Sequence, residues 1–163
     1  MSIAYPEFRA CRCTRYRFRY SACSRCADAC PHDAVALTDE GVRIDPARCQ
    51  NCALCVTACP TDALASEALK PVDMLRQAIR RERFAIACAP SGASADVVVP
   101  CLGAVDAASL AYLAKRRIPL TLRGSAYCEH CAHGARGAAQ LASNLDACAL
   151  LQDAAASADK PAD

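Results

Sequence analysis

The stretch that most constrains this chain is Cys49–Pro60, which reads C-Q-N-C-A-L-C-V-T-A-C-P. Its cysteines have the spacing C-x2-C-x2-C-x3-C with a proline directly after them, and this is the spacing that holds cubane iron–sulfur clusters. Three closely spaced thiolates bind three irons of one cube, whereas the fourth cysteine serves a second cube. A structural zinc site would instead need two separated C-x2-C pairs. The run therefore predicts iron–sulfur clusters.

A second copy of this run lies upstream, at a constant offset along the chain. Four of its residues repeat the later run: Cys23, Cys26, Cys30 and Pro31 correspond to Cys52, Cys55, Cys59 and Pro60. The position that corresponds to Cys49 is occupied by Tyr20, so the first run lacks its leading cysteine. Cys13 or Cys11 can supply that thiolate if the intervening segment loops out. We prefer Cys13 because it is nearer.

The cysteine content restricts the class of protein. Fourteen cysteines in 163 residues indicate either a secreted disulfide scaffold or an intracellular metal protein. The N-terminal sequence MSIAYPEFRACRC contains no apolar signal-peptide core, and no apolar run approaches the roughly 18 residues of a membrane span. We therefore expect a cytoplasmic metal protein. The net charge of +2 is too small to indicate a polyanionic partner for the whole chain.

A basic and aromatic arm, residues 9–20, precedes the first run. Arginines alternate with Tyr16, Phe18 and Tyr20, and this period of two predicts an extended segment. We expect the aromatic rings to cover a cluster and the arginines to dock an acidic partner or a neighbouring loop. Arginine and aromatic side chains also suit nucleic acids, but no known nucleic-acid-binding motif surrounds the arm. Nucleic-acid binding is therefore not expected.

Alternating segments follow the arm. Polar and apolar residues alternate around Glu40-Gly41, which predicts a hairpin with strands near 34–37 and 42–44. A helix is predicted over 66–83, with Pro71 in its first turn. Further along, strands are predicted at 84–87, 97–99 and 118–122, and helices at 105–117 and 134–156. Strands that alternate with helices indicate a small parallel α/β module.

The C-terminal half contains a second group of cysteines. Cys88 and Cys101 follow the first two predicted strands, and the pair Cys128 and Cys131 follows the third, with His130 and His133 close by. The carboxyl ends of parallel strands lie at one edge of a sheet, where ligands bind. These four cysteines therefore predict a third metal site, with an iron–sulfur cluster favoured and zinc or free or disulfide-forming thiols as alternatives. Cys148 lies in an apolar helical context and is expected in the core.

Residues 13–65 resemble bacterial two-cluster ferredoxins through these paired runs. The resemblance implies a ligand set for each cluster. Cluster 1 takes Cys13, Cys23, Cys26 and Cys59, with Cys11 as the alternative to Cys13; cluster 2 takes Cys30, Cys49, Cys52 and Cys55. Residues 84–140 are similar to small iron–sulfur subunits linked to hydrogenases and heterodisulfide reductases. A fourth cluster would need a histidine, another non-cysteine ligand or a cysteine from a partner, because only two cysteines remain.

The whole chain resembles the polyferredoxin subunit of bacterial tungsten aldehyde oxidoreductases. We expect an α+β fold, with a pseudo-twofold ferredoxin-type domain of two short hairpins and helices followed by the parallel α/β module. The expected boundaries are 1–68 for the ferredoxin domain with its arm, 69–156 for the module and 157–163 for a tail.

The resemblance implies an electron-transfer subunit without a catalytic residue of its own. It would relay electrons between a tungsten- or molybdenum-dependent oxidoreductase subunit and a second redox protein, and copies could associate into a longer cluster chain. A formate dehydrogenase or hydrogenase is the nearest alternative partner. From other classes, a cluster-containing regulator that binds nucleic acid and a zinc-stabilised scaffold are the alternatives.

Overall fold

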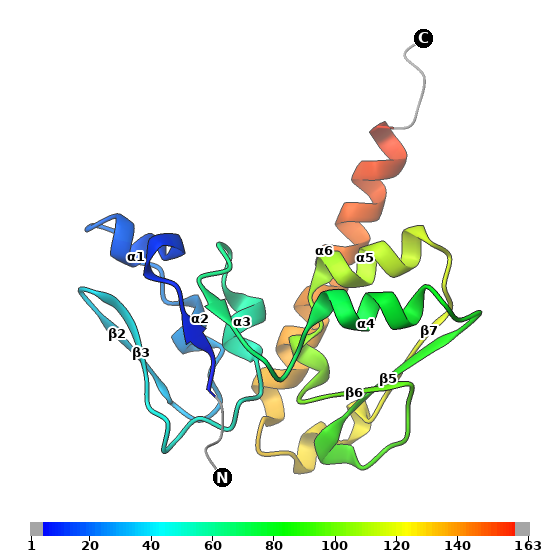
Figure 1. Cartoon of the computed structure of the whole chain (residues 1–163), viewed down its shortest axis with the longest axis horizontal. Coiled ribbons are helices and arrows are strands. Elements are labelled where there is room, and N and C mark those ends of the chain that lie inside the picture. The colour runs from blue at the N-terminus through cyan, green and yellow to red at the C-terminus, as the bar shows by residue number, and fades with distance from the viewer. Residues whose placement is uncertain (1–4, 159–163) are drawn as a thin grey trace.

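The computed structural model describes residues 5–158, and it has the expected α+β fold. Two parts of different architecture lie side by side (Figure 1). The N-terminal part has short helices and two small antiparallel sheets, whereas the C-terminal part has a three-stranded parallel sheet covered by helices. Among the described residues, none of the helices combines the length and apolar character that crossing a bilayer requires.

The N-terminal part is built from the internal repeat. Its strands are β1 (Glu7–Phe8), β2 (Val35–Thr38), β3 (Gly41–Ile44) and β4 (Leu64–Ala65), and its helices are α1 (Thr14–Arg17), α2 (Arg25–Asp28) and α3 (Leu54–Ala58). Strands β2 and β3 form the predicted hairpin. Strand β1 pairs antiparallel with β4, a pairing between distant segments that alternation within either segment could not predict. The second of the two expected hairpins is therefore a long-range strand pair.

The repeat also extends to the backbone turn after each cysteine–proline pair. Asp33 and Asp62 occupy equivalent positions and both have left-handed φ angles, 48° and 52° respectively. Aspartate tolerates this conformation better than most residues. Each turn leads directly into a strand, β2 after the first run and β4 after the second. The pseudo-twofold relation is therefore visible in the local backbone as well as in the cysteine spacing.

Two local predictions were wrong. The alternation in 15–20 predicted an extended arm, but Thr14–Arg17 form the helical turn α1, and the rings of Tyr16, Phe18 and Tyr20 are exposed and do not cover a cluster. The helix predicted over 66–83 is shorter, because α4 spans Pro71–Ala78. Ser66 explains the late start: its hydroxyl accepts a hydrogen bond from Ala68 N, 3.1 Å away, and such side-chain bonds favour turns over helix.

The C-terminal part follows the predicted order of elements. Strands β5 (Phe84–Cys88), β6 (Val97–Val99) and β7 (Leu120–Arg123) form a sheet of order β6-β5-β7 in which both pairings are parallel. Helix α5 (Ala107–Lys115) begins after Asp106, whose carboxylate accepts a hydrogen bond from Ser109 N at 2.7 Å. Such a cap satisfies an otherwise unpaired helix N–H.

The hydrophobic core of the C-terminal part lies between the sheet and helices α4, α5 and α6. It contains Phe84 and Ile86 of β5 together with Met74, Leu113 and Leu141 from the three helices. Helix α6 spans Gly134–Ala158 as one continuous helix and its far end projects beyond the rest of the molecule (Figure 1). Of the predicted tail, residues 159–163 lie outside the described residues.

The two parts contact each other through α6 and the short 3-10 turn η3 (Leu102–Ala104). Thr57 Oγ1 of α3 donates a hydrogen bond to the carbonyl oxygen of Ala104 at 2.6 Å. Arg136 of α6 donates to the carbonyl oxygens of Asp28 and Cys30 at the end of α2. Polar groups on both sides of the junction are therefore paired.

Candidate metal centres

Three separate cavities are each lined by four cysteines. The first is lined by Cys13, Cys23, Cys26 and Cys59. The second is lined by Cys30, Cys49, Cys52 and Cys55. The third is lined by Cys88, Cys101, Cys128 and Cys131. The structure thus brings together the same sets of four that the sequence and the ferredoxin resemblance predict.

The first cavity contains Cys13 and not Cys11. Backbone pairing explains this placement, because Arg9 N donates a hydrogen bond to Ala63 O at 2.8 Å and holds the arm beside the second run. The 3-10 turn η1 (Ala10–Arg12) then directs Cys13 inward, where its side chain is 8% exposed. Cys11 lies within that turn and is exposed. The geometry therefore favours Cys13 as the thiolate that replaces the missing cysteine at position 20.

The parallel sheet explains the third cavity. Cys88 ends β5, Cys101 follows β6, and Cys128 lies in the 3-10 turn η4 (Ser125–His130) that follows β7. All three therefore lie at the carboxyl edge of the sheet, where open α/β sheets place their ligands. Cys131 completes the group from the residue after η4. Cys148, by contrast, lies on α6 and packs into the hydrophobic core of the C-terminal part.

Backbone N–H groups point at several of the cysteine sulfurs. Ala34 N donates to Cys30 Sγ and Ala63 N donates to Cys59 Sγ, both at 3.3 Å and in equivalent positions of the repeat. His133 N donates to Cys131 Sγ at 3.4 Å. Hydrogen bonds to sulfur stabilise the thiolate form and tune the potential of a bound cluster. The donor set of these cavities thus fits metal-bound thiolates.

Burial disfavours the charged thiolate form of these cysteines, so a bound cation is needed to stabilise it. Burial raises the pKa of Cys26 to about 11 and the pKa of Cys101 to about 11, and neighbouring thiols add to both effects. Burial also raises the pKa of Cys55 strongly. Such sulfurs remain neutral thiols at neutral pH unless a metal displaces the proton. Four buried or partly buried thiols around one cavity therefore suit a site that iron or another thiophilic metal completes.

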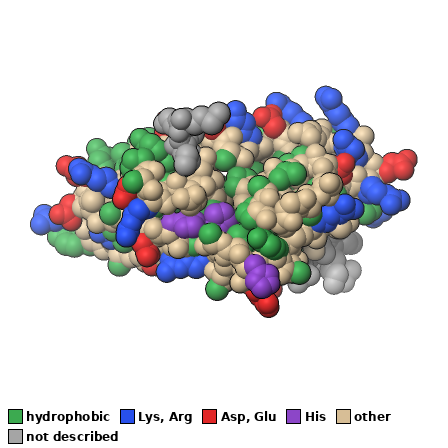
Figure 2. All heavy atoms as spheres, turned by 90° about the horizontal axis from the view of Figure 1, so that it is seen from below, with side chains coloured by type: hydrophobic (Ala, Val, Ile, Leu, Met, Phe, Trp, Pro, Cys, Tyr) green, Lys and Arg blue, Asp and Glu red, His purple; other side chains and the backbone are tan. Residues whose placement is uncertain are grey.

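The second and third cavities are adjacent. Cys52 of the second and Cys101 of the third pack in one buried cluster with Leu54. His32 lines the second cavity and His133 lines the third, and His32 Nε2 and His133 Nδ1 share a hydrogen bond of 3.0 Å. Their rings meet edge to face with centroids 5.2 Å apart, and on the face seen in Figure 2 histidine side chains gather near the middle of the molecule.

The histidine pair was not predicted from the sequence. A signal for it exists in the spacing: His32 lies two residues after Cys30, the last cysteine of the first run, and His133 lies two residues after Cys131, the last cysteine of the C-terminal group. The side-chain ligand atoms of His32, His133 and Cys52 lie within 4.8 Å of one another. Burial, and then the neighbouring His32, lower the pKa of His133. The pair therefore lies directly between two thiol-lined cavities.

Two glycines allow the close approach of α6 to this junction. A Cβ atom on Gly137 would lie 2.9 Å from Cys101 Sγ, and one on Gly103 would lie 2.5 Å from the carbonyl oxygen of Gly137. Real Cβ atoms almost never come this near to other atoms. Glycine at these positions therefore brings α6 against the loop that carries Cys101.

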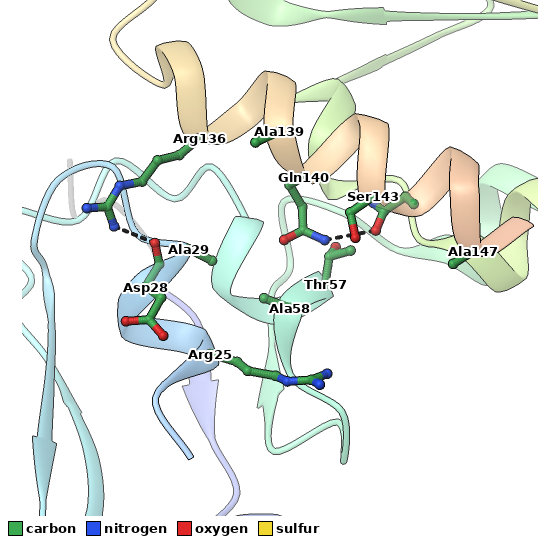
Figure 3. A pocket seen from close by; sticks show the side chains of 11 residues that line it. Arg25, Asp28, Ala29, Thr57, Ala58, Arg136, Ala139, Gln140, Ser143 and Ala147 are labelled. Atoms are coloured by element: carbon green, nitrogen blue, oxygen red, sulfur yellow. Dashed lines mark hydrogen bonds between the residues drawn. The ribbon is translucent and has the colours of Figure 1, made fainter. Parts of the chain in front are cut away.

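An open groove of a different kind lies between α2, α3 and α6 (Figure 3). Its walls include Arg25, Asp28 and Arg136, and Gln140 Nε2 donates to Asn144 Oδ1 at 2.9 Å. Arg136 reaches across to the carbonyl oxygen of Asp28, as the dashed line in Figure 3 shows. No cysteine or histidine is among the residues that line this groove, so it lacks the ligand set of the three cavities.

Comparison with known proteins agrees with the N-terminal site. Residues 21–63 match the family model of the 4Fe-4S dicluster domain. No curated protein and no solved structure matches the chain. The matched region contains seven of the eight cysteines that line the first two cavities, and Cys13 precedes it. This region is thus a 4Fe-4S dicluster domain, which supports an iron–sulfur electron-transfer role.

Proposed function

We propose that this protein is a three-cluster electron-transfer subunit in which electrons pass along the order first, second and third cavity. The observation that carries the proposal is the contact between the four-cysteine cavities: Cys26 of the first packs against the buried cluster that holds Cys30 and Cys55 of the second, and His32 and His133 join the second to the third. A 4Fe–4S cluster bound in each would accept and release one electron. We assign residues 1–68 to the ferredoxin domain and 69–156 to the module that extends the path.

The proposed task of this chain's own residues is to hold, shield and tune the clusters. Buried sulfurs such as those of Cys52 and Cys101 exclude water. Backbone donors, for example Ala34 N and Ala63 N, stabilise thiolate charge, and burial with hydrogen bonding to sulfur sets cluster potentials. The partner proposed to supply or take these electrons is a tungsten- or molybdenum-dependent oxidoreductase subunit, an expectation drawn from the cysteine-rich layout of the chain.

Metal and sulfide analysis of the anaerobically purified full chain tests the cluster count. Three 4Fe–4S clusters predict about twelve irons and about twelve acid-labile sulfides per chain. The variant Cys101→Ala should lower both to about eight and remove one paramagnetic signal. Cys11→Ser and Cys148→Ala are matched controls, because neither sulfur lines one of the three cavities, and both should keep the full count.

Other results would contradict the proposal in specific ways. About eight irons with one zinc, and an unchanged iron count in Cys101→Ala, would make the third cavity a structural zinc site. Stoichiometric zinc with little sulfide in the whole chain would refute the electron-transfer role. A loss of iron in Cys11→Ser would show that Cys11, rather than Cys13, completes the first site, and Cys13→Ser tests the same point directly.

A further inference from the structure

The arm beside the first cavity forms an exposed basic and aromatic surface, which we call the arm surface and define as residues 12–20. In Figure 1 helix α1 lies at the outer tip of the N-terminal part, on the side away from the three-stranded sheet. Cys13 belongs to the arm, Cys23 follows it closely, and both line the first cavity. The arm surface is therefore located at the first-cavity end of the proposed electron path.

The arm surface is strongly and locally positive. Residues 8–27 contain six of the chain's 19 Lys and Arg residues and none of its 17 Asp and Glu residues, so the remainder of the chain is net negative. Arg12, Arg17 and Arg19 are exposed. Among residues 5–158, none of these three forms an ion pair with a carboxylate. Their charge is available to an external partner.

Aromatic rings lie among these charges without being buried. Tyr16 is 54% exposed, Phe18 61% and Tyr20 79%. Phe18 and Tyr20 meet edge to face at 5.9 Å, and the guanidinium of Arg19 lies over the ring of Tyr20. Aromatic and arginine side chains are the residues enriched in the centres of protein interfaces. Exposed rings grouped in this way thus indicate a binding surface.

The arm surface also contacts the site itself. Thr14 and Arg15, from the first turn of α1, line the first cavity together with its cysteines. A partner seated on α1 would therefore lie within one layer of side chains of a cluster held there. Tyr127 is another exposed ring, and it lines the third cavity, but the guanidinium of the nearby Arg123 is held by the carbonyl oxygen of Ser94 at 2.8 Å.

We propose that the arm surface docks a redox protein with an acidic surface, and that electrons enter or leave the chain there. This inference rests on the proposed electron-transfer function. In the entering direction, the reduced centre of the partner would lose one electron and a cluster held by Cys13, Cys23, Cys26 and Cys59 would gain it, with no bond formed or broken. Complementary charge steers such partners and raises association rates by about 10- to 1000-fold.

A protein partner suits the observations better than a nucleic acid. The positive stretch is short, and the chain as a whole has a net charge of only +2. Nucleic-acid-binding domains usually carry a more extended basic face or a known motif. Helix α1 lies beside Cys13 and Cys23, so a redox protein docked there would be close enough to exchange electrons with the first site, whereas a nucleic acid carries no redox centre.

Anaerobic stopped-flow kinetics test the docking surface. The full cluster-containing chain is mixed with a reduced, strongly acidic flavodoxin as the probe, and separately with dithionite as a small reductant. The variant Arg17→Glu/Arg19→Glu should lower the second-order rate constant for reduction of the chain by flavodoxin at least about tenfold at low salt. It should also weaken the dependence of that rate constant on salt. The control Arg80→Glu/Arg83→Glu changes the same charge at exposed positions outside the arm and should alter the rate less than about twofold.

The outcomes separate the two proposals. In one outcome dithionite reduces all clusters, and the rate constant with flavodoxin is the same in both variants as in the parent chain. This result would overturn the docking surface and leave the electron-transfer function intact. Equal losses in both variants would assign the effect to net charge and also overturn it. Failure of dithionite to reduce any cluster would refute the proposed function. Salt-dependent binding of a DNA duplex to the arm, tighter than that of flavodoxin and abolished by Arg17→Glu/Arg19→Glu, would replace the protein partner with a nucleic acid.

Discussion

Asn144 provides a test of how the long helix α6 is held at the junction. Its side chain is buried, at 5% exposure, and its amide nitrogen donates to two carbonyl oxygens, that of Gly103 at 3.0 Å and that of Val105 at 2.8 Å. Both carbonyls belong to the segment that directly follows Cys101. The change Asn144→Ala removes both of these hydrogen bonds and leaves the two acceptors without this donor; it also removes the hydrogen bond that Gln140 Nε2 donates to Asn144 Oδ1 within α6.

The expected loss follows from those two bonds. Each contributes about 1 kcal/mol net, and a buried acceptor left unpaired costs about 1–3 kcal/mol. Because relaxation recovers part of this cost, we expect a loss of about 2–4 kcal/mol in the free energy of unfolding. For a chain of this size, 1 kcal/mol corresponds to about 2–4 °C in the melting temperature. Asn144→Ala should therefore melt about 4–16 °C below the parent.

Anaerobic thermal unfolding of the cluster-containing protein, followed by circular dichroism, measures this shift. Ser143→Ala is the matched control, because Ser143 is the exposed preceding residue of α6 and should change the melting temperature by less than about 2 °C. Iron content is measured in parallel to verify that equal cluster loading is compared. A melting temperature of Asn144→Ala equal to that of Ser143→Ala would refute the assignment of these bonds as the attachment of α6.

Two further predictions concern the same junction. Gly137→Ala places a methyl group 2.9 Å from Cys101 Sγ, so a chelator should remove iron from the third site at least about tenfold faster than from the first two. The control is Ala138→Ser, at an exposed neighbouring position. Equal rates of iron loss in Gly137→Ala and the control would show that α6 shifts to accommodate the methyl group without weakening the site. A double-mutant cycle of His32→Ala and His133→Ala, read from urea unfolding, should give a coupling of about 0.5–1.5 kcal/mol for their 3.0 Å hydrogen bond. Additive effects of the two changes would mean that the histidine pair contributes nothing to holding the two parts together.

Much of the fold and of the candidate site could be predicted because the signals are local. Ligand spacing is a property of a few consecutive residues, so the run at Cys49–Pro60 indicated its cluster chemistry without any tertiary information. The alternation around Gly41 predicted the β2–β3 hairpin, and Cys88 and Cys101 could be assigned to one sheet edge once their strands were expected to be parallel.

Local signals failed where another part of the chain decides the conformation. The arm was expected to be extended, but pairing of β1 with β4 leads into a turn and the helix α1. The start of α4 at Pro71, several residues later than expected, coincides with a turn that Ser66 stabilises and with a hydrogen bond from Ser66 to Asn51 of the second run. Neither effect is encoded in the periodicity of the segment itself.

The sequence by itself determined the spacing of the cysteine runs, and from it an α+β protein with iron–sulfur sites could be predicted, while the ferredoxin resemblance implied the ligand sets of the first two sites. Only the tertiary structure placed Cys13 and not Cys11 in the lining of the first cavity and brought the second and third cavities together. The physical reason is distance along the chain: His32 and His133 are 101 residues apart, and side chains so far apart meet only when packing of α6 on the dicluster part brings them together. Packing also made the arm surface, because it buries Cys13 and leaves Arg17, Arg19 and the rings beside them exposed to solvent.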